Sequence, residues 1–124
     1  MKKRGGFTFL EIMVVMVVIA VLATIAIPTY SNFVKRAKRV EAQQSLSEIG
    51  KRETVYFIDN GVYSNDLVAV GFDTTKLKYY TISVAVGVPP DSFVATATGN
   101  IDRDGDLDVW TIDETTNLNH VSID

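Results

Sequence analysis

Hydrophobic residues are distributed unevenly along the chain, and their spacing predicts three kinds of segment. Residues 12–27 are all apolar except for one Thr. Residues 33–58 carry apolar side chains mostly at three- and four-residue steps among Lys, Arg, Glu and Gln, which indicates an amphipathic helix. Later segments, most clearly residues 79–86, alternate with the period of two that predicts a β-strand. We therefore expect a long helix followed by a small sheet.

The apolar run is long enough to cross a membrane. The 21 residues from Phe7 to Ile27 would measure about 32 Å as an α-helix, which matches the ~30 Å hydrocarbon core of a bilayer. A cleaved secretory signal would need a small-x-small site after a shorter apolar run, and residues 23–28 offer no clean one. A core helix would show a polar face, and residues 12–22 show none. A transmembrane segment over residues 7–30 is favoured.

The amphipathic half, residues 31–58, should continue the same helix. No proline follows Pro28 before Pro89, and Glu48 with Arg52 forms a favourable i,i+4 pair. Pro28 itself removes one backbone donor and is expected to loosen the helix locally. The sequence Asp-Asn-Gly at residues 59–61 is a typical helix stop.

Residues 59–124 are predicted to form a globular head. Residues 62–76 lack a clear period and are predicted to be a loop, while strands are predicted at 79–86, 93–101 and 107–113, with a short fourth strand at 120–123. A sheet of three or four strands cannot cover its own apolar face, so the amphipathic helix should pack on it and bury Leu46, Ile49 and Tyr56. The predicted fold class is α+β, with one long N-terminal helix packed on a small antiparallel β-sheet.

Charge is also distributed unevenly, between an N-terminal part that is basic and a remainder that is acidic. Residues 1–40 contain seven Lys or Arg and one acidic residue, a net charge of +6, whereas residues 41–124 have a net charge of −9. The acidic region shows no stripe of basic residues with interleaved aromatics, so no specific nucleic-acid partner is predicted. The absence of cysteine excludes disulfides and thiolate metal sites. A lone histidine such as His120 is more typical of a surface or packing position, and we expect no enzyme activity.

One carboxylate, Glu11, lies inside the predicted span, where an unpaired charge costs about 3 kcal/mol or more near the bilayer centre. No Lys or Arg occurs between Phe7 and Ser31. The only cation available at a similar depth is the amino group released by cutting the chain between Gly6 and Phe7. That amine could pair with Glu11 of its own helix or of a neighbouring subunit, and the second pairing would fix the axial register of two apolar helices.

These residues together resemble a known family signal. A basic leader, Met1 to Gly6, is followed by Phe7-Thr8-Phe9-Leu10-Glu11 and by a span that ends in Ile27-Pro28. This arrangement resembles the class III signal peptide of type IV pilins and pseudopilins, closely so over residues 1–31. The resemblance implies a ladle-shaped fold, cleavage after Gly6 and N-methylation of Phe7 by a membrane aspartic peptidase. It also implies polymerisation through the helix, with assembly residues Phe7, Glu11 and Pro28.

The resemblance further implies a structural subunit of a fimbrial homopolymer, the type IV pilus. The implied partners are other copies of the chain, the inner membrane before assembly, the prepilin peptidase and the pilus assembly machinery. The leader would be cytoplasmic and the head outside, before the chain joins the extracellular pilus. Four basic residues follow the span closely, so that counting charges by the positive-inside rule gives nearly equal numbers on its two sides: Lys35, Arg36, Lys38 and Arg39. We expect these residues to face neighbouring subunits or the acidic heads in a filament.

Two alternative functions stay open. A type II secretion pseudopilin shares the signal and the acidic C-terminal region, but its Asp-Pro-Trp-Gly stretch is absent here. The other alternative is a membrane-tethered calcium-binding or adhesive domain. It draws on four carboxylates at alternate positions around Gly105, a pattern that gathers hard oxygen ligands for Ca²⁺: Asp102, Asp104, Asp106 and Asp108.

The acidic loop departs from the EF-hand pattern. Gly105 is the fourth residue of the loop instead of the sixth, and the twelfth is Asp113 instead of Glu. A polar hairpin turn with Asp104-Gly105 at its tip is therefore the favoured interpretation. No cofactor is required by the predicted fold, and Ca²⁺ is the one cofactor that the sequence raises.

Overall fold

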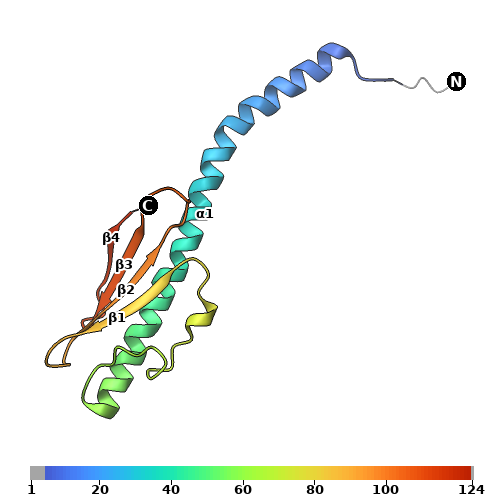
Figure 1. Ribbon diagram of the computed structural model, residues 1–124. Coiled ribbons are helices and arrows are strands. Elements are labelled where there is room, and N and C mark those ends of the chain that lie inside the picture. Colours follow the sequence, from blue (N-terminus) through green and yellow to red (C-terminus); the bar gives the residue numbers. More distant parts are fainter. Residues whose placement is uncertain (1–4, 124) are drawn as a thin grey trace. The chain divides into compact units, whose positions relative to one another are not determined.

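The computed structural model describes residues 5–123, so most of the predicted leader lies outside the described residues. A single long helix precedes a four-stranded sheet (Figure 1). Helix α1 comprises Phe9–Asn60 and a short 3₁₀-helix, η1, comprises Thr74–Lys76. The strands are β1 (Thr81–Val86), β2 (Phe93–Gly99), β3 (Asp108–Asp113) and β4 (Leu118–Ser122). The predicted α+β fold, a long helix packed on an antiparallel sheet, is confirmed.

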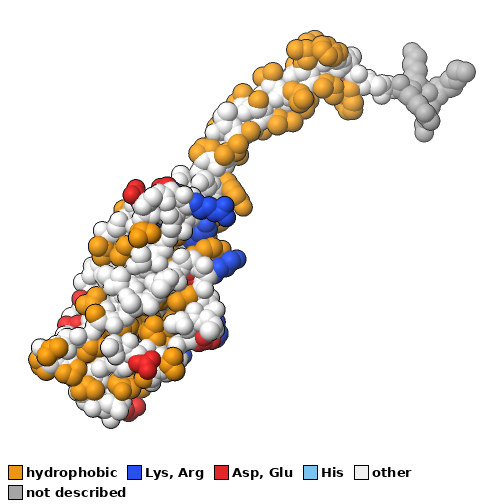
Figure 2. Space-filling view, in the orientation of Figure 1, with side chains coloured by type: hydrophobic (Ala, Val, Ile, Leu, Met, Phe, Trp, Pro, Cys, Tyr) orange, Lys and Arg blue, Asp and Glu red, His pale blue; other side chains and the backbone are white. Residues whose placement is uncertain are grey.

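The chain divides into two compact units between Val34 and Lys35. The first unit contains the start of α1, which is long and apolar enough to cross a membrane, with a mean hydropathy of 2.9 and no buried residue in its most apolar stretch. Apolar side chains cover the face of this helix that Figure 2 shows. The helix continues through Pro28, and on either side of it the hydroxyls of Thr24 and Thr29 donate to backbone carbonyls at 2.6 and 2.9 Å.

The second unit is the head, in which the four strands form an antiparallel meander in the order β1-β2-β3-β4. Side chains alternate between the two faces of the sheet, as the period of two requires. One row of the inner face contains Ile82, Ala97, Trp110 and His120, which are paired across the strands. A register shift between Val109 and Trp110 lets β4 pair with β3 along a twisted edge.

One face of α1 covers the inner face of the sheet and completes the core. Leu46 and Ile49 are fully buried, as their spacing predicted, and each burial contributes roughly 1.5–3 kcal/mol. Tyr56, the third residue of that predicted face, packs partly buried against the rim of the same core. Gly50 lets the helix approach β3 closely, because a Cβ at this position would lie 3.1 Å from the Cδ1 of Ile112.

Two details of the head were not predicted from the sequence. The predicted loop at residues 62–76 contains η1, which is capped by Asp73, whose carboxylate accepts from the Thr75 amide at 3.0 Å. Such a cap depends on a single side chain and leaves no periodic pattern. Strand β4 begins two residues before the predicted start at residue 120, because its register is set by pairing with β3 and not by its own alternation.

Gly99 is required where β2 approaches the segment before β1. A Cβ at this position would lie 2.5 Å from the carbonyl oxygen of Tyr79 and 2.9 Å from the ring of Tyr80. We expect Gly99→Ala to lower the free energy of unfolding by about 1–3 kcal/mol, because a backbone oxygen cannot move aside without shifting its strand. Thermal unfolding of the detergent-solubilised protein, followed by circular dichroism, measures this change.

Gly105→Ala is the matched control, since nothing lies within 4 Å of the added Cβ. This variant should stay within about 0.5 kcal/mol of the wild type. Equal stability of the two alanine variants would contradict the steric role of Gly99.

Candidate functional site

The start of α1 contains the predicted processing and assembly residues. Gly6 and Phe7 lie exposed before the first helical residue, so the peptide bond between them is outside regular structure. The Thr8 amide donates to Oε2 of Glu11 at 3.4 Å, and the Glu11 amide donates to Oγ1 of Thr8 at 3.2 Å. These reciprocal bonds form a capping box, which satisfies backbone donors that a helix N-terminus leaves unpaired. Glu11 is therefore held at the end of its own helix.

Thr8 was not predicted to be a functional residue, although the sequence signal was visible. Thr-x-x-Glu before an apolar run is a recognised sequence pattern for a helix start. The carboxylate at this end of the helix also complements the positive end of the helix dipole. Pro28, the other predicted assembly residue, lies exposed within α1.

Asp108 is a fully buried carboxylate of the head that contacts side chains from three elements and from one residue between elements. Its Oδ2 accepts hydrogen bonds from the Tyr80 hydroxyl at 2.5 Å and from the Trp110 indole at 2.7 Å. Its Oδ1 lies 3.2 Å from Nε of Arg39 and 2.7 Å from Nε2 of His120. These donors come from α1, from the residue before β1, from β3 and from β4. Asp108 therefore links the helix to both halves of the sheet.

The surroundings of Asp108 favour its charged form. Burial raises the pKa of this carboxyl, but the hydrogen bonds from Tyr80, His120 and Trp110 together outweigh burial and hold the pKa below its ordinary value. The imidazole of His120 stacks on the indole of Trp110, with ring centroids 4.0 Å apart and planes 9° from parallel. The lone histidine is thus a packing residue, and its bond to the carboxylate requires the proton on Nε2.

The structure does not bring the four carboxylates of the acidic loop together. Asp102 forms an ion pair with Lys35 and accepts from the Asp104 amide at 3.1 Å, while Asp104 accepts from the Asp106 amide at 2.8 Å. Asp108 is buried in the core, where its carboxylate accepts hydrogen bonds from Tyr80 and Trp110. Among residues 5–123, no group of three or more acidic or histidine side chains is arranged to hold a metal ion. Calcium binding by this loop stays a prediction.

Three of the four basic residues after the span are used inside the head. Lys35 pairs with Asp102, Lys38 donates to the Ile101 carbonyl at 2.6 Å, and Arg39 pairs with Asp108. The expectation that the four face neighbours or acidic heads in a filament stays a prediction, but the structure shows that three of them contact the head of their own chain. The sequence could not show this, because each contact joins residues more than sixty positions apart.

Two of the head's ammonium groups lie beside one aromatic ring. The Nζ atoms of Lys38 and Lys78 are 5.2 and 5.3 Å from the ring centroid of Tyr79, which is 37% exposed. Figure 2 shows basic side chains gathered along one side of the head. We call Lys38, Lys78 and Tyr79 the basic-aromatic patch. It is a local positive surface on a head whose overall charge is negative.

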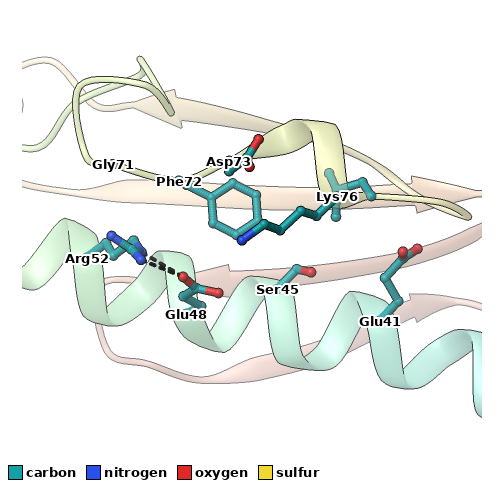
Figure 3. A pocket seen from close by; sticks show the side chains of 9 residues that line it. Glu41, Ser45, Glu48, Arg52, Gly71, Phe72, Asp73 and Lys76 are labelled. Carbon is teal, nitrogen blue, oxygen red and sulfur yellow. Dashed lines mark hydrogen bonds and ion pairs between the residues drawn. The ribbon is translucent and has the colours of Figure 1, made fainter.

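A cleft in the head separates α1 from the segment that contains η1 (Figure 3). Its α1 wall carries the ion pair between Glu48 and Arg52, whose Nε and Nη2 both lie 2.8 Å from one carboxylate oxygen. On the opposite wall Phe72 is buried, and the side chain of Lys76 runs along the opening (Figure 3). Glu48 and Arg52 therefore largely neutralise each other, and Glu41 adds one further carboxylate to the α1 wall.

Glu41 closes one end of this cleft and anchors the following segment to α1. Its carboxylate accepts from three successive backbone amides, those of Lys78, Tyr79 and Tyr80, at 2.6, 2.7 and 3.2 Å. Buried or half-buried amides outside regular structure need such partners. Glu41 thereby sets where the chain enters β1, and no local sequence pattern indicates this role.

Comparison with known proteins shows two matches to family models. Residues 28–107 match the family described as "Type IV minor pilin ComP, DNA uptake sequence receptor". Residues 1–27 match the prokaryotic N-terminal methylation motif. The two matches are contiguous and meet at Pro28.

Individual relatives agree with these matches. The chain is 36% identical to the fimbrial protein EcpC of Eikenella corrodens over 93 residues, which are 75% of this chain and 61% of that protein. Its fold is similar to that of a type IV pilin from Shewanella oneidensis, with a TM-score of 0.54 and 20% identity over 72% of this chain and 99% of the other. The chain thus spans about three fifths of the length of the curated relative.

The Asp108 cluster predicts a defined dependence of stability on pH. Because the folded-state pKa lies below the ordinary value of 3.8, the contribution of Asp108 is complete above that value and is lost as the pH falls through the lowered pKa. We expect Asp108→Asn to cost about 3 kcal/mol or more at pH 7, because it leaves buried donors without their charged acceptor. The difference from the wild type should shrink below pH 4.

Urea unfolding at pH 7 and pH 3, followed by the fluorescence of Trp110, measures both effects. Asp106→Asn, which alters an exposed carboxylate, is the control and should change stability by less than about 0.5 kcal/mol. An Asp108→Asn variant as stable as the wild type at pH 7 would show that the cluster does not hold the head together.

Proposed function

Because the chain belongs to the type IV pilin family, as a ComP-like minor pilin, we propose that it is a pilus filament subunit, processed after Gly6 and assembled through α1. The observation that carries this proposal is Glu11, a carboxylate at the start of a helix whose apolar stretch is entirely exposed. The family and the fold are structural and not enzymatic. An exposed apolar helix needs either lipid or other helices around it.

Cleavage would supply the missing cation. Hydrolysis of the Gly6–Phe7 bond releases an ammonium group four residues before Glu11, and N-methylation of that amine keeps its positive charge. In an apolar environment this ammonium and a carboxylate attract each other strongly. Pairing with Glu11 of another copy would compete with the bond from the Thr8 amide, which is long at 3.4 Å. A neighbour's ammonium is the stronger partner, because both groups are then charged.

The proposed location follows from the same features. Before assembly the first unit would lie in the inner membrane, with the leader in the cytoplasm and the head outside, and the processed chain would then enter an extracellular pilus. The proposed partners are other pilins, the prepilin peptidase and the assembly machinery. Because the chain spans only part of EcpC, no role of that longer protein is transferred.

DNA binding is a second candidate function, and a specific observation favours it. The matching family is described as a DNA uptake sequence receptor, and the head of this chain carries the basic-aromatic patch. Ammonium groups contact phosphates, and an exposed tyrosine ring can stack on a base or sugar. The acidic remainder of the head would confine DNA to this one surface.

The filament proposal predicts a specific mature chain and a specific defective variant. Mass spectrometry of purified filaments should find chains that begin at N-methylated Phe7. Glu11→Ala should reduce filament yield at least about tenfold at an equal subunit level, which corresponds to a loss of only about 1.4 kcal/mol per subunit contact. Filament yield is measured by shearing and immunoblotting, with the total subunit as reference.

Glu48→Ala is the control, because Glu48 is an exposed carboxylate on the head half of α1. It should assemble like the wild type. Filaments built from chains that retain Met1 would refute the processing step, and a normal yield of Glu11→Ala filaments would refute the pairing.

The DNA proposal predicts that Lys78→Ala weakens binding of duplex DNA about equally for all sequences and lowers the salt dependence by roughly one counterion. Fluorescence anisotropy at several salt concentrations measures this. Lys51→Ala is the control, since Lys51 lies thirteen residues from Lys38 on α1, about 20 Å along the helix. Equal losses in both variants, or no binding by the wild type, would refute the assignment to the patch.

A further inference from the structure

Glu53 is a buried acid, and only one of its two carboxyl oxygens has a hydrogen-bond partner among the described residues. The side chain lies on the core face of α1 and is 0% exposed. Its Oε2 accepts a hydrogen bond from the Ser64 amide at 3.0 Å, but its Oε1 has no hydrogen-bond partner among residues 5–123. Such an atom is uncommon in folded proteins and costs about 1–3 kcal/mol, and more when the group is charged.

No charged group compensates for this burial. The influences on Glu53 are burial, which raises its pKa, and the Ser64 amide, which lowers it by less. Within the described residues, none of the other titratable or charged groups on the elements that pack here hydrogen-bonds to Glu53. On α1 the groups within two turns of Glu53 are Glu48, Lys51, Arg52, Tyr56 and Asp59; Tyr63 and Asp66 follow the helix, and Asp91 lies between β1 and β2.

The Ser64 contact holds a defined segment against the helix. Residues 61–66, which we call the latch segment, follow α1 directly and contain no helix or strand. Tyr63 of this segment stacks on Phe57 with ring centroids 4.6 Å apart and lies 4.8 Å from the ring of Phe93. The Tyr63 amide donates to the Pro90 carbonyl at 3.0 Å. The segment therefore connects α1 to the turn between β1 and β2.

We propose that Glu53 is a proton-operated latch: its neutral carboxyl lets the latch segment close on α1, and its ionisation loosens that segment. A neutral carboxyl can be buried with one hydrogen bond at moderate cost, whereas a carboxylate with an unpaired oxygen draws water into the core. Opening the segment is the simplest way to admit that water. The turn between β1 and β2 responds to the same proton, because Tyr63 holds it.

The direction of the effect follows from the raised pKa of the buried acid. Closure raises the pKa of Glu53 above its ordinary value of 4.5, so the closed segment binds the proton more tightly than the open one. The contribution of Glu53 to closure is complete below the ordinary value and is lost as the pH rises through the raised pKa. The closing equilibrium changes about tenfold for each pH unit that separates the closed-state pKa from the open-state pKa.

Nuclear magnetic resonance of the full chain in detergent micelles tests the latch without any mutation. Protection of the Ser64 amide against hydrogen exchange, corrected for the intrinsic rate, is measured from pH 4.5 to pH 8. We expect protection to fall about tenfold for each pH unit between the open-state and closed-state pKa values of Glu53. The Tyr79 amide, which Glu41 holds in a similar way, is the internal reference and should keep its protection. A constant Ser64 protection over this range overturns the proposal.

Two variants then identify the acid. Glu53→Gln cannot ionise, so its Ser64 amide should stay protected up to pH 8 and lose the pH dependence. Glu48→Gln, which neutralises an exposed carboxylate on the same helix, should titrate like the wild type. A pH dependence that survives in Glu53→Gln overturns the assignment, and if that variant does not fold, the wild-type titration still decides.

Discussion

The head depends on one buried carboxylate, Asp108. Four donors from separate elements converge on its two oxygens, and no disulfide is available to hold those elements instead. Burying the charge costs several kcal/mol, so its bonds must first offset that cost before they stabilise anything. Their main effect is on arrangement: α1, the start of β1 and the edge strand β4 can satisfy Asp108 together in one register only. The register shift between β3 and β4 lies close to Asp108, between Val109 and Trp110.

Three acidic side chains of α1 have one role in common. Glu11, Glu41 and Glu53 each accept backbone amides from irregular segments, at the helix start, before β1 and after the helix. Amides outside helices and strands have no ladder partner, and a carboxylate supplies a strong acceptor. The three sites differ in solvent access, and this decides their chemistry. Glu41, half-buried with three donors, serves as an anchor, whereas Glu53, buried with one donor, responds to protons.

Local patterns determined how much of this structure could be predicted from the sequence. Leu46 and Ile49 were predicted to be core residues because helical spacing is a local signal, and the first three strands followed from full or partial alternation. The Thr8-x-x-Glu11 capping box has an equally local pattern, but a carboxylate in an apolar span also fits a membrane charge, which is the role predicted for Glu11. Asp108 was grouped with its sequence neighbours as a calcium ligand candidate. Its real partners lie up to 69 residues away, and no local pattern encodes them.

The basic residues at the end of the span show how folding restricts assembly. Lys35, Lys38 and Arg39 hold the 101–108 region to α1, and the charges of Lys35 and Arg39 are neutralised within the head by Asp102 and Asp108. Breaking the Arg39 contact to pair with a neighbour would leave Asp108 without its guanidinium partner, at a cost of several kcal/mol. Charge pairing between heads must therefore rely on other residues, such as the exposed Arg36. In the proposed filament, the apolar half of α1 and the charge of Glu11 would then be the main determinants of subunit register.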